Sequence, residues 1–152
     1  MDSIDKAILA RLQRDSDTPV AEIAESVGLS STPCWRRIKK LEERGVIRRR
    51  VALADMKSVN LNLTAFVAVK TAQHTETWLR SFAANIARIP EVVEVYRMSG
   101  EVDYLLKVVC PDMAHFDRIY KRLISIADFA DVRSTFSMEE LKYTTELPLD
   151  YA

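Results

Sequence analysis

The stretch that decides the fold is SSTPCWRRIKKLEERGVIRRR, residues 30–50. Ser30 is a favourable helix N-cap, and Gly45 ends the helix as a residue that tolerates positive φ. The apolar residues between them share one face at spacings of four and three: Cys34, Ile38 and Leu41. We therefore predict an amphipathic helix that packs inward on this face.

The opposite face of this helix is polar. At 100° per residue, Thr32, Arg36, Lys39 and Glu43 project away from the apolar stripe, with Trp35 and Lys40 on the flanks. Hydroxyls, an indole and bases on an exposed helix fit the major groove of B-DNA, where the first residues of the helix meet the base edges.

The sequence before residue 30 predicts two further helices. Apolar residues recur at helical spacing over residues 3–14, and again over 20–27, where Thr18 is the expected N-cap and Pro19 the first helical residue. Gly28 ends the second helix only two residues before Ser30. Two helices joined by so short a turn must cross steeply, which is the helix-turn-helix arrangement.

The sequence after Gly45 predicts a basic wing. IRRRVALAD, residues 47–55, alternates apolar and basic residues and is expected to form a strand beside the helix. Residues 36–50 hold eight bases and two acids, although the whole chain has 22 of each sign and no net charge. On charge alone a solvated helix face explains this cluster, but beside a helix-turn-helix it favours binding to a polyanion.

We therefore predict that Thr32, Arg36 and Lys39 reach into the groove and that the basic wing meets phosphates. The full set of predicted DNA-binding residues is Ser30, Ser31, Thr32, Trp35, Arg36, Arg37, Lys39, Lys40, Arg48, Arg49 and Arg50.

The second half of the chain predicts a different domain. Strand patterns at 63–71, 90–98, 104–110 and 132–138 alternate with two helical patterns in the order β-α-β-β-α-β. The fold class is therefore α+β: a winged helix-turn-helix over residues 1–54, a linker over 55–61 and a ferredoxin-like domain over 62–152. Both helices should cover one face of the antiparallel sheet, so its open face is expected to mediate dimerisation.

Several separated motifs resemble the Lrp/AsnC family of feast/famine regulators. They are VGLSSTPCWRRIKKLEERGVI at 27–47, MSGEVDYLLKV at 98–108 and MEELKYTTELPL at 138–149. The resemblance implies a transcriptional regulator that binds double-stranded DNA, senses an amino acid, and assembles as homodimers and often octamers.

The resemblance also implies an effector site at the turn after residue 98. The predicted residues are Ser99, Gly100, Glu101, Val102, Asp103, Tyr104 and, on the last strand, Arg133. Gly100 would allow close backbone approach, and Asp103 could pair with an α-ammonium group. An ordinary hairpin turn with hydrated carboxylates is the alternative.

The sequence does not predict an enzyme, a cofactor or a metal site. His74 and His115 are isolated, Cys110 is far from the other cysteine, and no catalytic motif occurs. No apolar run approaches the ~20 residues of a membrane span, and a cytoplasmic location is expected. The two alternatives to an amino-acid-responsive regulator are an amino-acid-binding regulatory module and an architectural DNA-binding protein without a ligand. Steep salt dependence of DNA binding and a response to amino acids separate the three.

Overall fold

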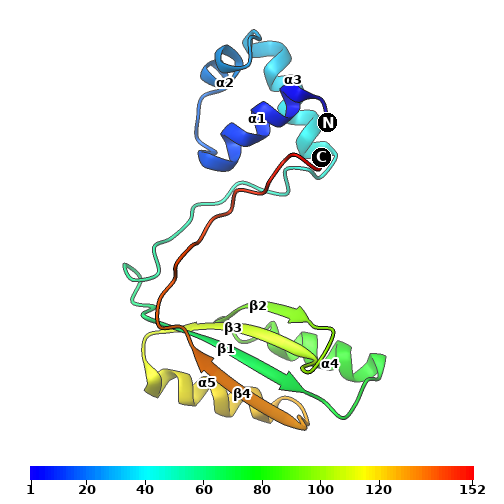
Figure 1. Ribbon diagram of the computed structural model, residues 1–152, viewed down its shortest axis with the longest axis vertical. Helices are drawn as coiled ribbons and strands as arrows, with labels where there is room; N and C mark the ends of the chain where they lie inside the picture. The colour runs from blue at the N-terminus through cyan, green and yellow to red at the C-terminus, as the bar shows by residue number, and fades with distance from the viewer. The chain divides into compact units, whose positions relative to one another are not determined.

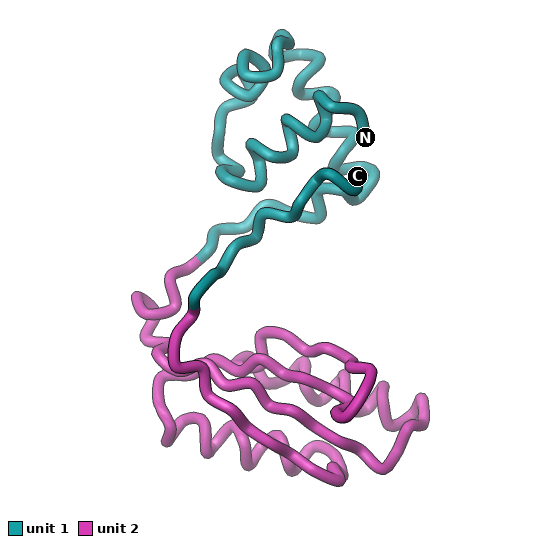
Figure 2. The backbone as a smooth tube through the Cα atoms, in the orientation of Figure 1, with its two compact units in different colours: residues 1–53, 141–152 teal, residues 54–140 magenta.

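The computed structural model describes residues 1–152 and contains two compact units (Figures 1 and 2). The first unit contains three helices: α1 (Ser3–Arg14), α2 (Val20–Ser26) and α3 (Ser31–Glu43). Their apolar faces form one core of buried residues: Ile8, Leu12, Ile23, Ala24, Cys34, Ile38 and Leu41. The predicted three-helix arrangement and the inward face of α3 are thus confirmed.

The caps of these helices follow the sequence with one exception. Asp2 caps α1 by accepting a hydrogen bond from the Asp5 backbone N–H at 2.8 Å. Gly28 has φ +69°, as expected after α2. The prediction for Thr18 is wrong: Pro19 is the N-cap of α2, and the Thr18 hydroxyl instead donates to the Asp15 carbonyl oxygen at 3.1 Å.

The predicted wing strand over residues 47–55 is also wrong, because these residues form no strand. Ile47 turns back onto α3 through a hydrogen bond from its N–H to the Leu41 carbonyl oxygen and packs against the core. Val51 and Leu53 are more than half exposed. Alternation of apolar and polar residues predicts a strand but not the strand that pairs with it. A strand needs a hydrogen-bonding neighbour, which this chain does not provide for residues 47–55.

The second unit has the predicted α+β order. Its elements are β1 (Leu63–Lys70), α4 (Glu76–Ile86), β2 (Val92–Arg97), β3 (Tyr104–Cys110), α5 (Met113–Ser125) and β4 (Asp131–Phe136). All strand pairs are antiparallel, in the order β2-β3-β1-β4. This is the ferredoxin-like arrangement.

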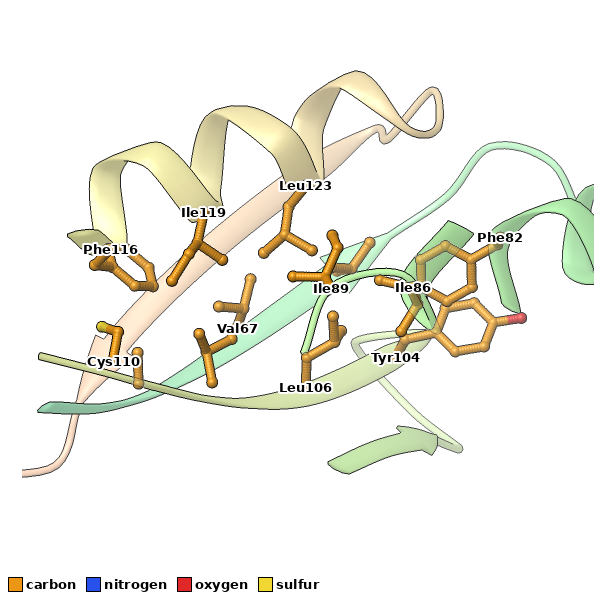
Figure 3. Close-up of a cluster of buried hydrophobic side chains, with 13 residues drawn as sticks. Val67, Phe82, Ile86, Ile89, Tyr104, Leu106, Cys110, Phe116, Ile119 and Leu123 are labelled. Atoms are coloured by element: carbon orange, nitrogen blue, oxygen red, sulfur yellow. The ribbon is translucent and has the colours of Figure 1, made fainter. Parts of the chain in front are cut away.

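The core of the second unit lies between the sheet and its two helices (Figure 3). Alternate residues of β1 and β3, such as Val67 and Leu106, are fully buried against Phe82 of α4 and Ile119 of α5. The register puts the intervening residues on the other face, where Phe66 and Tyr96 are exposed. The helices cover one face of the sheet, as predicted.

The expected domain boundary at the C-terminus differs from the structure. Residues 141–152 belong to the first unit, not to the 62–152 domain, and residues 54–61 belong to the second (Figure 2). The Gln13 side-chain amide of α1 holds this C-terminal segment: Nε2 donates to the Leu147 carbonyl oxygen at 3.1 Å, and Oε1 accepts from the Leu147 N–H at 2.7 Å. Arg14 adds an ion pair with Glu146 at 3.1 Å.

Candidate functional site

The outer face of α3 is solvent-accessible along its whole length. Thr32, Arg36 and Lys39 are all exposed, while the opposite face is buried. Ser30 is the N-cap by backbone position, but its side chain makes no capping hydrogen bond. The hydroxyls of the first turn are therefore available to an external acceptor.

Arg37 does not belong to this outer face. Its Nη1 lies 2.7 Å from Asp2 Oδ2 and 2.7 Å from Asp5 Oδ1, so it joins α3 to the start of α1. Hydrogen bonds to Asp2 and Asp5 raise the pKa of Arg37 above its ordinary value. The guanidinium of Arg37 is already paired within the domain, so DNA would have to compete with Asp2 and Asp5 for it, and the DNA contact of Arg37 stays a prediction.

The Arg37 ion pair predicts a pH dependence of stability. The Asp5 N–H and Arg37 both hold the pKa of Asp2 below its ordinary value of 3.8. A lowered carboxyl pKa stabilises the folded state above pH 3.8 and stops doing so as the pH falls through the lower, folded value. Arg37→Gln should therefore be less stable than wild type at pH 7, and the difference should shrink below pH 3.8.

Urea unfolding of both proteins at several pH values measures this difference. Lys40→Gln removes a charge from the same helix at an exposed position and serves as the control. A gap that stays constant down to the lowest pH would contradict the assigned role of Asp2.

Glu42 neutralises two of the predicted DNA-binding bases. Its carboxylate lies 2.7 Å from Lys39 Nζ and 3.2 Å from Arg50 Nη2, and these cations lower the pKa of Glu42, Lys39 foremost. Lys39 Nζ also lies 5.9 Å from the centre of the Trp35 ring. Arg50 donates in addition to the Ser16 carbonyl oxygen at 3.3 Å, so a phosphate must compete with groups of the domain for both bases.

The remaining bases are unpaired. Arg36, Lys40, Arg48 and Arg49 are exposed and form no ion pair or hydrogen bond within the chain. Arg44, at the C-cap of α3, is a further exposed base of this kind that was not among the predicted contacts. Its place in the basic run between Arg36 and Arg50 is the sequence signal that could have included it.

The predicted effector turn joins β2 to β3. Gly100 has φ +126°, a conformation that strains any side-chain-bearing residue. One carboxylate oxygen of Asp103 accepts a hydrogen bond from the Thr71 N–H at 2.8 Å, and its backbone N–H donates to the Val69 carbonyl oxygen at 2.9 Å. Asp103 therefore fastens the turn to the end of β1, and its other oxygen, Oδ1, has no partner within the chain.

Charged side chains meet at this end of the sheet. Lys70 Nζ lies 3.9 Å from Glu101, and Lys70 is also the ladder partner of Asp131, which pairs with Arg133 at 2.8 Å. The structure thus brings Glu101 and Arg133 to the same edge through Lys70, which was not predicted as a site residue. Lys70 is the one charged residue of the 63–71 strand pattern, and that exception was its sequence signal.

Tyr104, by contrast, is a core residue. It is 7% exposed, and its ring lies 5.0 Å from Phe82 and 5.7 Å from Trp78, centroid to centroid. The alternation of β3 turns its ring toward the helices, and its role as an effector contact stays a prediction. Ser99 and Glu101 are exposed, and Val102 is half-buried in the turn.

The chain shows no cluster of three His, Cys, Asp or Glu side chains that could hold a metal ion. No helix has both the length and the apolar character to span a bilayer. What the two units offer is an exposed basic helix and, on a separate domain, a charged turn.

These features define a two-domain DNA-binding regulator. Residues 1–48 match the family model for winged helix-turn-helix DNA-binding domains, and residues 64–147 match the model for the Lrp/AsnC ligand-binding domain. The chain belongs to the Lrp/AsnC family of transcriptional regulators.

Its relatives cover nearly its full length. It is 44% identical to the DNA-binding transcriptional activator DecR of Escherichia coli over 99% of both chains. An AsnC family regulator from Agrobacterium tumefaciens is 58% identical with a TM-score of 0.96, over 99% of both chains. A transcriptional regulator from Neisseria meningitidis, solved as a complex with L-methionine, is 38% identical with a TM-score of 0.94 and covers 99% of this chain and 98% of its own. The relatives are regulators rather than enzymes.

Proposed function

We propose that this protein regulates transcription by binding specific DNA with α3 and that its DNA affinity or oligomeric state responds to an amino acid. The observation that carries the proposal is the row of exposed bases without internal partners on and after α3. Because a buried or paired base gives little to a phosphate, their availability favours nucleic acid over a purely solvated surface. The L-methionine complex of the Neisseria relative supports an amino acid as the effector class.

On the DNA side, Thr32 and Arg36 are proposed to meet base edges, with Ser31 and Trp35 beside them. Arg48 and Arg49 are proposed to contact phosphates. Lys39 and Arg50 join them when phosphate displaces Glu42, a step that makes their contribution smaller than that of the unpaired bases.

On the effector side, the turn at Ser99–Asp103 is the proposed ligand site. Oδ1 of Asp103 can accept from an ammonium group while Oδ2 keeps its hydrogen bond to Thr71. Arg133 pairs with Asp131 through Nε, so its Nη atoms can receive the carboxylate. Both charged groups can therefore bind the ligand while they keep their contacts within the chain.

The open face of the sheet supports a homodimer. It carries Phe66 and Tyr96, which are 37% and 51% exposed, next to the Glu94–Lys107 ion pair at 3.3 Å. Apolar rings on an uncovered sheet face gain free energy when a second copy buries them. An octamer assembled from such dimers, acting on DNA in the cytoplasm, completes the proposal.

Gel-shift titrations of selected DNA, with and without each of the twenty amino acids, test the proposed function. We expect binding that weakens steeply between 50 and 200 mM salt, which is the signature of phosphate contacts. At least one amino acid should shift the DNA affinity. If the protein binds DNA and no amino acid changes the affinity, the result would indicate an architectural DNA-binding protein. If it binds an amino acid but not DNA, the result would indicate an amino-acid-binding regulatory module.

Asp103→Asn should separate sensing from DNA binding. The substitution keeps an oxygen that can accept from Thr71 but removes the charge that an ammonium group would meet. We expect the active amino acid to bind about 10- to 100-fold more weakly, the range of a charge-assisted hydrogen bond. Calorimetric titration measures this loss, and a gel shift without effector should be unchanged.

Two results would contradict this assignment. If Asp103→Asn binds the amino acid with wild-type affinity, the Asp103 carboxylate does not contact the ligand. Loss of DNA binding without effector would show that Asp103 acts by holding the turn.

A further inference from the structure

A cavity of about 200 Å³ lies at the far end of β3 from the effector turn. It is formed where β3 ends, where the chain enters β2, and along α5, and its lining includes Glu91, Cys110, His115, Arg118 and Arg122. Figure 3 shows Cys110 and Tyr104 at opposite ends of β3. Six residue steps at about 3.3 Å each place the two sites about 20 Å apart.

One carboxylate oxygen of Glu91 in this cavity lacks a hydrogen-bond donor. Its Oε2 atom is buried and accepts no hydrogen bond. The nearest cation is Nη1 of Arg122, at 3.7 Å, which is ion-pair distance but beyond a hydrogen bond. Arg122 is held there because its Nη2 donates to the Arg88 carbonyl oxygen at 3.1 Å. A buried carboxylate oxygen without a donor is costly, so the site favours a molecule that brings an N–H group.

The Arg118 guanidinium in the same cavity lacks a hydrogen-bond acceptor. Arg118 lies on the same face of α5 as Arg122, one turn earlier, and its guanidinium forms no ion pair or hydrogen bond. Its five donors are therefore available to an anion.

Cys110 and His115 in this cavity each have a partner within the chain. Cys110 Sγ donates to the Asp112 carbonyl oxygen at 3.5 Å, and burial raises the pKa of this thiol. His115 Nδ1 lies 2.8 Å from the Asp112 carboxylate, whose pKa it lowers. The cavity thus offers one acceptor for a donor group and one guanidinium for an anion, with a second guanidinium close by.

We propose that this cavity binds a small zwitterionic amino acid, with its ammonium group on Glu91 and its carboxylate on Arg118 and Arg122. The cavity matches such a ligand in charge, because it offers an acceptor for the ammonium group and guanidinium groups for the carboxylate. It also matches in size, because it is smaller than the roughly 300–1,000 Å³ of pockets for drug-sized ligands. Neither Glu91 Oε2 nor the Arg118 guanidinium must abandon a hydrogen bond to bind the ligand. The proposal does not depend on the effector turn, because the two sites share no residue.

Calorimetric titration of the full-length protein with glycine, L-alanine and L-serine tests the proposal. Acetate and methylammonium serve as probes that carry only one of the two charges. Three variants are compared: Glu91→Gln, Arg118→Gln, and the control Lys121→Gln, which removes an exposed charge from the same helix outside the cavity. We expect one of the three amino acids to bind the wild type more tightly than either single-charge probe. Its affinity should fall about 10- to 100-fold in Glu91→Gln and in Arg118→Gln and stay unchanged in Lys121→Gln.

Three outcomes would overturn the proposal. Absence of binding by all three amino acids is the first. Binding of acetate as tight as that of the amino acids, lost in Arg118→Gln but not in Glu91→Gln, would define a simple anion site instead. Binding lost in Asp103→Asn but kept in Arg118→Gln would place the amino acid at the turn, and the proposed function would then stand without this second site.

Discussion

Arg36→Ala is expected to weaken binding to specific DNA by about 1–3 kcal/mol, or 5- to 150-fold, in a gel-shift titration at moderate salt. Arg36 is exposed on the outer face of α3 and has no partner within the chain, so its whole donor set is available to DNA. Its removal costs the folded protein no ion pair. The loss should therefore appear in binding and not in the free energy of unfolding.

The pattern of the loss tells which group Arg36 contacts. A base contact predicts weaker binding only to DNA that retains the preferred base, with relaxed preference at one position of each half-site. A phosphate contact predicts the same loss on every sequence and a shallower salt dependence. Arg80→Ala, an exposed arginine on α4 paired with Glu76, is the matched control for losing one positive charge. Equal binding by Arg36→Ala and wild type would mean that another face of the unit meets DNA.

Ile38→Ala should have the largest effect on stability. Ile38 is 2% exposed at the centre of α3 and packs in a core of seven buried residues. Truncating a buried isoleucine to alanine costs about 2–5 kcal/mol, a large share of the stability of a small unit. We expect the first unit to unfold locally and DNA binding to be lost, while the second unit keeps its own core.

Amide hydrogen exchange measured segment by segment checks this expectation. Protection should fall in α1, α2 and α3 and persist in β1 and β3. Ile38→Val, which removes one methylene, should cost only about 0.5–1.5 kcal/mol and retain DNA binding. Full protection of α1 in Ile38→Ala would contradict a shared core for the three helices.

The sequence predicts the helices, the strands and their order along the chain well because all three rest on short-range periodicity. The spacing of Cys34, Ile38 and Leu41 alone orients α3, and alternation in β1 and β3 alone separates the buried face from the open one. These patterns are local, and the core that they imply is the one observed.

The sequence does not predict contacts between residues that lie far apart in the chain. Arg36 and Arg37 are adjacent and identical, yet only Arg37 finds two carboxylates, at Asp2 and Asp5, more than thirty residues away. Asp103 likewise meets the Thr71 N–H, which no spacing indicates. The predicted wing failed for a related reason, since alternation gives a strand its faces but not its neighbour.

The hydrogen bonds between the Gln13 side chain and the Leu147 backbone also affect how fragments and labelled forms of the protein should be designed. Both chain ends belong to the DNA-binding unit, so the ligand-binding domain is in effect an insertion, entered and left by separate crossings of the chain. A fragment ending at residue 53 would keep all three helices but strip α1 of the hydrogen bonds and ion pair that residues 146 and 147 supply. A dye or affinity tag placed at the C-terminus would accordingly report on the DNA-binding unit, although the last named strand of the chain lies in the other one.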